Sequence, residues 1–193
     1  MVPHTERVAK AQRAIFTIGH STHPIEKFVE LVSHHEIAII ADVRSFPSSR
    51  KWPQFNQGPF EESLRRAGIG YRWIKQLGGR RHSKREGSLH TGWTHPAFRS
   101  YADYTETADF AAGLAELEQL ATDARLAYLC SEGVWWRCHR RIISDHLLVR
   151  GWQVQHIMPA GKLALHALTP FARIDSRRIV YDRSPLAEHA VRD

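Results

Sequence analysis

The chain has 193 residues, of which 42% are apolar, and its six Trp and eight Phe are enough for a sizeable core in a single domain. No apolar run approaches the roughly 18 to 20 residues needed to span a bilayer, and the first residues lack the apolar core of a signal peptide, so we expect a cytoplasmic protein with no membrane contact. Two cysteines are too few for a secreted disulfide framework, so we expect reduced thiols, with a reversible bridge as the alternative.

The net charge is +7, and the positive excess is concentrated in one segment. Residues 44–99 carry twelve Lys or Arg against three acids, whereas the rest of the chain has slightly more acids than bases. Such a segment indicates an anionic partner, either an anionic small molecule or a nucleic acid. The alternative is a solvated basic loop with no partner.

The first elements alternate between strand and helix. The apolar run at residues 15–18 predicts a strand that ends at Gly19, His20 and Ser21. Pro24, followed by apolar residues at helical spacing, predicts a helix to about residue 35. A second strand is predicted at residues 37–43, where the nearly continuous apolar run at residues 37–41 suits a parallel strand that is covered on both faces.

The middle of the chain loses this regular pattern. Residues 46–98 are predicted to form a long irregular basic insert after the second strand, interrupted by a short helix at residues 60–67 and a strand at residues 71–74. One helix is then predicted from about Ser100 to Ala121, with these residues facing the core: Tyr104, Ala108, Ala111, Leu114, Leu117 and Leu120.

Both cysteines flank a single strand-to-helix turn. Residues 126–129 predict a strand that ends at Cys130, and helical spacing from Ile142 onward places Cys138 near the start of a helix. Backbone N–H groups at a helix N-terminus bind anions and lower the pKa of a nearby thiol. A last strand is predicted at residues 154–157, which leaves one domain at residues 14–158 and a loosely packed basic tail at residues 159–193.

Alternating strands and helices predict a three-layer α/β domain with a mainly parallel sheet in a flavodoxin- or Rossmann-like order. If the first strand is central, the topological switch point lies between it and the cysteine strand, where ligands bind. Reactive residue types from three strand ends would then meet at the carboxyl edge of the sheet: His20 and Ser21, Asp42 and Arg44, and Cys130 and Glu132.

Together these motifs resemble the family known only as domain of unknown function 488. The matching pieces are TIGHS at residues 17–21, DVRSFPSS at 42–49, the 68–71 stretch with Leu-Gly-Gly at 77–79, and CSE and CHR at 130–132 and 138–140. The resemblance covers roughly residues 15–157, with several motifs in the same order. It implies a compact α/β domain with a site at these motifs, and it implies no particular reaction.

One candidate chemistry is a cysteine nucleophile, with Cys130 the stronger candidate, acting on a phosphate-bearing substrate. Neighbouring cationic side chains can activate a thiolate, and the sequence supplies Arg137, His139, Arg140 and Arg141. The separation of Cys130 from Arg137 is one residue longer than in the loop of cysteine phosphatases, and Glu132 would repel phosphate. These departures count against a phosphatase mechanism.

A second candidate chemistry is a zinc or iron site formed by Cys130, Cys138 and His139, with His20 or Glu132 as a further ligand. The spacing lacks the C-x2-C knuckle of structural zinc sites. Adjacent residues on a helix also point about 100° apart, which disfavours a shared ion for Cys138 and His139.

A third interpretation is nucleic-acid binding, because aromatic residues are interleaved with the basic residues. Cations engage phosphates while aromatic faces stack on bases. The alternative is that these aromatics pack the insert onto the sheet: Trp52, Phe55, Tyr71, Trp73, Trp93, Trp135 and Trp136.

The sequence as a whole predicts an intracellular enzyme acting on a nucleotide or nucleic-acid component. Its predicted catalytic residues are Cys130, Glu132, His20, Asp42, Cys138 and His139, and its predicted anion- or substrate-binding residues are Arg44, Arg140, Ser21, Arg80, Arg81 and Trp135. Asp42 and Arg44 could instead pin the strand end, and Arg140 could instead pair with Glu132. A non-catalytic nucleic-acid-binding module with a structural cysteine turn, or a zinc- or iron-binding protein, remains the alternative function.

Overall fold

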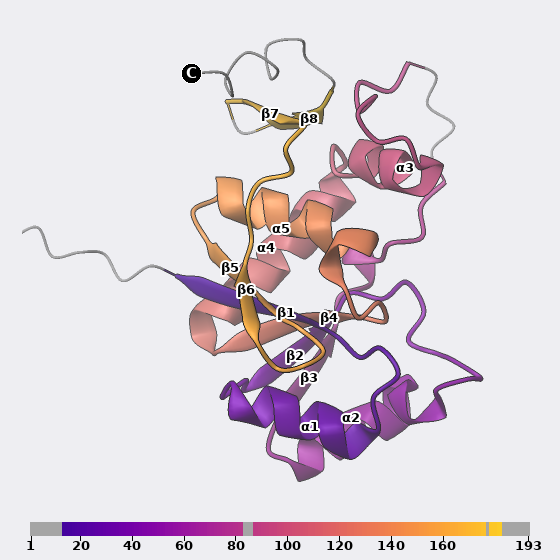
Figure 1. Ribbon diagram of the computed structural model, residues 1–193, viewed down its shortest axis with the longest axis vertical. Coiled ribbons are helices and arrows are strands. Elements are labelled where there is room, and N and C mark those ends of the chain that lie inside the picture. The colour runs from indigo at the N-terminus through magenta and orange to yellow at the C-terminus, as the bar shows by residue number, and fades with distance from the viewer. Residues whose placement is uncertain (1–12, 83–86, 177, 183–193) are drawn as a thin grey trace, which may run out of the picture.

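The computed structural model describes residues 13–82, 87–176 and 178–182 (Figure 1). Its centre is a six-stranded sheet with the order β3-β2-β4-β1-β5-β6. The first five strands in the chain are parallel, and β6 (Leu163–Leu165) runs antiparallel to β5. The parallel strands are β1 (Ala14–Gly19), β2 (Ile39–Asp42), β3 (Gly70–Trp73), β4 (Leu126–Cys130) and β5 (Gln153–Ile157). The predicted α/β class with a mainly parallel sheet is confirmed.

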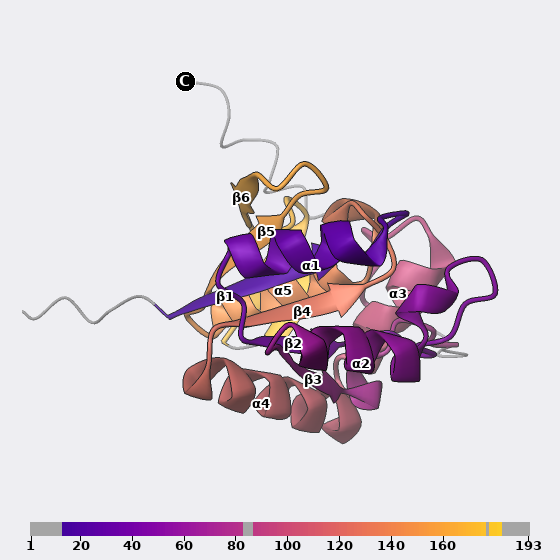
Figure 2. The ribbon, with the colours of Figure 1, turned by 90° about the horizontal axis from the view of Figure 1, so that it is seen from below.

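Two helical layers cover the two faces of this sheet (Figures 1 and 2). Helices α1 (Ile25–His34) and α2 (Gln57–Arg66) lie on one face, and α4 (Ala108–Asp123) and α5 (Arg140–Val149) lie on the other. Alternate residues of the central strands β1 and β4 enter separate cores, as Ile15 and Phe16 of β1 do. In the described part of the chain, no helix is both long and apolar enough to cross a membrane.

The first strand is central, as expected, because β1 pairs with β4 on one side and with β5 on the other. In a flavodoxin-like order β1 and β2 are neighbours, whereas here β4 lies between them. The chain leaves β1 toward α1 on one face and leaves β4 toward α5 on the other. The crevice between the carboxyl ends of β1 and β4 is therefore a topological switch point, where ligands of open α/β sheets bind.

The segment predicted as one helix from Ser100 to Ala121 is two helices, α3 (Pro96–Tyr104) and α4. The break falls at Thr107, whose side chain accepts a hydrogen bond from the backbone N–H of Phe110 and so caps a new helix start. Leu114 and Leu117 are buried as predicted, but Ala108 and Ala111 are exposed, because the buried face of α4 is the one that carries Phe110, Gly113, Leu114 and Leu117.

The insert after β2 contains more regular structure than its composition indicates. It includes α2 and β3 together with two short 3-10 turns, η1 (Pro53–Phe55) and η2 (Lys75–Leu77). A third such turn, η3 (Trp135–Arg137), follows β4. The parts of the insert that remain irregular lie at residues 46–52 and 78–95, and both border the cleft described below.

The described residues after 159 are more ordered than a loosely packed tail. Strand β6 extends the main sheet, and β7 (Ala172–Asp175) and β8 (Arg178–Tyr181) form a hairpin. Tyr181 is buried in the core on the α4–α5 side of the sheet, which ties the hairpin to the domain. Arg183 and the rest of the predicted basic tail lie outside the described residues.

Candidate functional site

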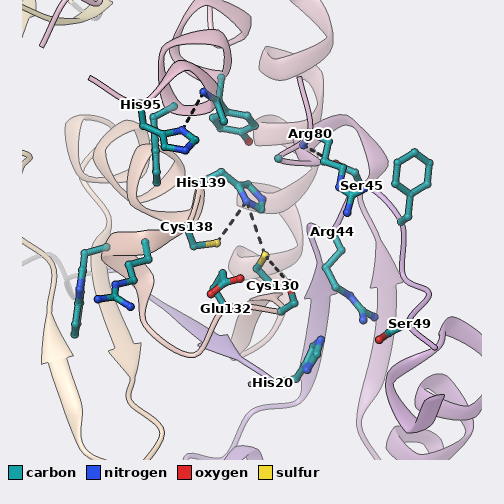
Figure 3. Close-up of a pocket in the computed structure, with 18 of the residues that line it drawn as sticks. His20, Arg44, Ser45, Ser49, Arg80, His95, Cys130, Glu132, Cys138 and His139 are labelled. Carbon is teal, nitrogen blue, oxygen red and sulfur yellow. Dashed lines mark hydrogen bonds between the residues drawn. The ribbon is translucent and has the colours of Figure 1, made fainter. Parts of the chain in front are cut away.

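A cleft of about 1110 Å³ opens at the carboxyl edge of the sheet (Figure 3). Its walls come from the ends of β1, β2 and β4, from the start of α5, and from the irregular parts of the insert. The predicted site residues that line it are His20, Arg44, Arg80, Cys130, Glu132, Cys138 and His139. Residues far apart in the chain therefore meet here because parallel strands end at the same edge.

The loops after β1 and β4 are joined along the floor of this cleft. The backbone N–H of His20 donates to the carbonyl of Cys130 at 3.0 Å, and that of Ser21 donates to the carbonyl of Ser131 at 2.9 Å. A Cβ on Gly19 would lie 1.7 Å from the carbonyl oxygen of Glu132. Only glycine allows the two backbones to approach this closely.

Cys130, Cys138 and His139 form a compact cluster on one wall of the cleft (Figure 3). Nδ1 of His139 lies 3.4 Å from Sγ of Cys138 and 3.8 Å from Sγ of Cys130. Cys138 has an extended backbone (φ −135°, ψ 152°), and His139 is the N-cap residue of α5. The two residues precede the helix, so the expected divergence of about 100° between helical neighbours does not apply.

The ring of His139 is fixed by its surroundings. Its Nε2 lies 3.0 Å from the carbonyl oxygen of Val43, and because a carbonyl only accepts, Nε2 donates. In the neutral ring the lone pair is then on Nδ1, which faces the two sulfurs. Tyr101 packs edge-on at 5.1 Å, and a Cβ on Gly79 would lie 2.4 Å from Nδ1, so no larger residue fits beside the ring.

The two buried thiols have opposite electrostatic environments. Hydrogen bonding to Cys138 and burial raise the pKa of Cys130. Burial also raises the pKa of Cys138, but the hydrogen bond from Cys130 and the charge and N–H groups of Arg140 outweigh it and lower that pKa overall. In the metal-free dithiol, the environment thus favours Cys138 as the thiolate, whereas the sequence favours Cys130 as the nucleophile.

Arg44 is held rigidly at the cleft by a buried carboxylate. Its Nε donates to Asp42 at 2.9 Å, Tyr71 donates to the same carboxylate at 2.8 Å, and Nη1 of Arg44 donates to the carbonyl of Phe55 at 2.8 Å. Asp42 is fully buried and does not line the cleft. The sequence left open whether Asp42 takes part in proton transfer or holds the end of the strand through an ion pair with Arg44. This buried position fits the second role better.

His20 lies beside Arg44 on the floor of the cleft (Figure 3). Its ring stacks on Phe55 with centroids 4.2 Å apart, and its Nδ1 lies 3.0 Å from the carbonyl oxygen of Ser21. Burial and then the charge of Arg44 lower the pKa of His20 to about 4. The ring is therefore neutral near pH 7.

Two predicted anion-binding residues hold the loops together and do not line the cleft. Arg140 is buried and donates to Thr17 Oγ1 at 3.1 Å and to the backbone carbonyl of Glu132 at 2.5 Å, so it contacts Glu132 through the main chain and not through the carboxylate. Ser21 adopts a positive φ of 50° and packs against Gly133.

Arg81 and Trp135 also point elsewhere. Arg81 donates to the carbonyl of Gln76 at 2.9 Å, and its guanidinium lies 3.8 Å from the ring centroid of Tyr104. Trp135 stacks on His156 at 4.2 Å, and it is the next residue, Trp136, that lines the cleft. Sequence alone could not assign adjacent tryptophans to opposite sides of a turn.

The cleft has further lining residues that were not among the predicted catalytic or binding residues, although the sequence drew attention to Trp52, Trp136 and Arg137. The DVRSFPSS motif drew attention to Asp42 and Arg44, and it also supplies four other lining residues. The motif was therefore the sequence feature from which these four could have been predicted. The further lining residues are Ser45, Phe46, Ser48, Ser49, Trp52, Gly79, His95, Ala97, Phe98, Tyr101, Ser131, Trp136 and Arg137.

Ion pairs engage several of the basic side chains in the segment at residues 44–99. Arg65 and Arg66 both pair with Glu62, and Arg72 pairs with Glu116. Of the twelve basic residues between 44 and 99, those that line the cleft within the described ranges are Arg44 and Arg80. Lys84 and Arg85 lie outside the described residues. The net charge of +9 that the twelve basic and three acidic residues give this segment therefore does not form one continuous positive surface at the cleft.

Comparison with known proteins gives one match. Residues 24–147 match the model of the family described as Domain of unknown function DUF488. The matched span includes Asp42, Arg44 and both cysteines, and His20 lies four residues before it. No curated protein and no solved structure gave a match.

Proposed function

This chain belongs to the DUF488 family, and we propose that it is an enzyme whose active site is the cleft and whose substrate carries a phosphate group. The proposal rests on the guanidinium of Arg44, which is held in place by hydrogen bonds and lines the cleft. This guanidinium has five N–H groups, and three of them are engaged, because Nε and Nη2 donate to Asp42 and Nη1 donates to the carbonyl of Phe55. Two N–H groups are left for a ligand at a side chain that lines the cleft.

A rigid guanidinium suits a phosphate better than it suits a single point charge. Its planar fork matches two phosphate oxygens at once. The contacts to Asp42 and Phe55 fix the side chain before a ligand arrives, which reduces the entropy lost on binding. Arg80 and Arg137 line the same cleft and add positive charge. The substrate class we favour is a nucleotide or a nucleic-acid component.

The chemistry would take place between this cation and the cysteine cluster. Glu132 and His20 remain the acid–base candidates, because both line the cleft. Cys130, Cys138 and His139 line the same cleft, as nucleophile or as metal ligands. Asp42 acts in this scheme as a positioning residue for Arg44. Arg140 positions the cysteine loop through Thr17 and the Glu132 carbonyl.

The test is calorimetric titration with inorganic phosphate and with AMP. Arg44→Lys keeps a charge beside Asp42 but loses the fork, so affinity should fall about tenfold, the equivalent of one charge-assisted hydrogen bond. Arg80→Gln removes an exposed lining cation, should leave folding intact and should weaken binding by a smaller factor. Arg81→Gln is the matched control outside the cleft and should bind as the wild type does.

Equal affinities in all four proteins would overturn the proposal, as would a wild type that binds neither probe at low salt. If phosphate compounds bind, a screen for their turnover follows, with Glu132→Gln and Cys130→Ser as the comparison variants.

The second candidate function is a non-catalytic nucleic-acid-binding module. It is favoured by two exposed aromatic side chains that line the cleft, Phe46 at 64% and Trp136 at 44% exposure, since exposed rings can stack on bases. Affinity for a single-stranded oligonucleotide should then fall steeply with salt. Unchanged binding and phenotype in Cys130→Ser and Glu132→Gln would favour this module over the enzyme.

A further inference from the structure

We propose that Cys130, Cys138 and His139 bind one zinc ion, with the fourth coordination position facing the cleft. These three residues offer two sulfur atoms and one imidazole nitrogen, all within 4.8 Å of one another. Thiolate and imidazole are the donors that zinc takes in proteins. The inference does not depend on the phosphate proposal, because it uses different residues of the cleft.

The spacing of the donor atoms fits a tetrahedral ion. Bonds of about 2.3 Å to sulfur and about 2.05 Å to nitrogen place a sulfur and a nitrogen ligand about 3.6 Å apart. Nδ1 of His139 lies 3.4 Å from Sγ of Cys138 and 3.8 Å from Sγ of Cys130. An ion could therefore enter with small side-chain adjustments and without moving the backbone.

The surroundings prepare His139 for metal binding. Its Nε2 donates to the carbonyl of Val43, which fixes the tautomer that presents the Nδ1 lone pair to the sulfurs. A backbone carbonyl or carboxylate in this position is the usual partner of a metal-binding histidine, since it orients the ring and raises its basicity. Gly79 and Tyr101 hold the ring from the sides.

The cluster has the composition of a catalytic site more than that of a closed structural one. Structural zinc sites have four protein ligands, whereas catalytic sites have three and leave one position for water or substrate. Within the described ranges, no fourth His, Cys, Asp or Glu side chain belongs to this group. All three members line the cleft, so a small molecule can reach the open position.

A reversible disulfide is the competing state for the same two sulfurs. Both cysteines are free thiols in the structure. A disulfide would use the sulfurs alone and would remove the S–H groups that face Nδ1 of His139, whereas an ion would bind both sulfurs and the imidazole nitrogen together. The experiment must therefore separate bound metal from oxidised sulfur.

The experiment is elemental analysis of untagged protein purified with a thiol reductant and without chelator, followed by titration of the metal-stripped protein with Co²⁺. We expect close to one zinc per chain and a sulfur-to-cobalt charge-transfer absorption band. Cys130→Ser, Cys138→Ser and His139→Gln should each lower the metal content several-fold. His95→Gln is the matched control, because His95 lines the same cleft without joining the cluster.

Gly79→Ala tests the geometry with all three ligands still present. The added Cβ would meet the His139 ring and displace Nδ1 from the sulfurs. We expect weaker Co²⁺ binding and an unchanged count of titratable thiols. Circular dichroism spectra and melting curves confirm that each variant is folded, so that loss of metal is not read from an unfolded chain.

The proposal is overturned if reduced wild-type protein neither contains zinc nor binds Co²⁺, or if the three ligand variants retain as much metal as His95→Gln. Iron at the same stoichiometry, lost in the same variants, would support the site. The phosphate proposal fails separately, because Arg44→Lys and Arg80→Gln should keep their metal whatever their affinity for phosphate.

Discussion

Two histidine-containing clusters lie on either side of the loop between β4 and α5, and they differ in how their polar atoms are used. In the cleft, two sulfurs and the lone-pair nitrogen of His139 face one another beside an open cavity. On the other side, His156, His166 and Asp145 form a buried hydrogen-bonded chain. The cleft cluster leaves sulfur and nitrogen lone pairs for a ligand, whereas the buried chain uses its polar atoms, apart from Nδ1 of His156, in hydrogen bonds that connect elements of the fold.

The buried chain connects three parts of the fold. Nε2 of His156 lies 3.0 Å from Nδ1 of His166, whose Nε2 lies 2.9 Å from Asp145. Asp145 also accepts from the backbone N–H of Thr169 and from the hydroxyl of Tyr181, both at 2.9 Å. α5, β5 and the β7–β8 hairpin are thereby tied together. Such a network stabilises a fold because each donor in it is paired with an acceptor.

The largest expected effect comes from breaking the buried chain at Asp145. Asp145→Ala leaves three donors without their acceptor, so the free energy of unfolding should fall by about 3–5 kcal/mol. Asp145→Asn keeps one acceptor oxygen and should cost less. Chemical denaturation measures both. The metal content of folded Asp145→Asn should equal that of the wild type, and a loss of metal there would show that the two clusters are not independent.

The adjacent tryptophans give the next test. Trp135 stacks on His156 and packs edge-on to His166, so Trp135→Ala should destabilise the protein by about 3 kcal/mol. Trp136 is 44% exposed at the cleft, so Trp136→Ala should change the unfolding free energy by less than about 0.5 kcal/mol. Thermal denaturation of the pair measures the difference. Equal destabilisation would contradict the division of this loop into a structural and a cleft-facing side.

Within the range from pH 7 to pH 5, the smallest of the three effects is on the pH dependence of stability. Burial, then the charges of His166 and Arg140, lower the pKa of His156 to about 2 from an ordinary value of 6.5. The unfolded chain therefore binds this proton more readily. The contribution to stability is complete above pH 6.5 and is lost as pH falls, by about 1.4 kcal/mol for each pH unit.

His156→Gln removes this contribution and still offers a donor to His166. Unfolding free energies between pH 7 and pH 5 should fall less steeply in the variant than in the wild type. Burial also lowers the pKa of His20 and of His146, and these remain in both proteins, so only the difference between the two slopes reports on His156. Parallel curves would mean that His156 is not buried in its neutral form.

The elements that the sequence predicts well are those with strong periodicity. β1, α1, β2 and β4 lie where their apolar patterns place them, and the switch point between β1 and β4 follows from their alternation. Prediction fails where a single side chain changes the backbone. Thr107 caps a helix start that the apolar pattern cannot reveal, since the pattern continues on both sides of it.

The sequence by itself determined the fold class and the sheet edge that carries the candidate site, because strand ends and chemical residue types can be read directly from a chain. Only the tertiary structure decided which side chains face the cleft. Asp42 lies behind Arg44, Trp135 turns away while Trp136 does not, and Cys138 meets His139 only because its backbone is extended before α5. In loops there is no repeating geometry to orient a side chain, so its direction depends on contacts with distant parts of the chain.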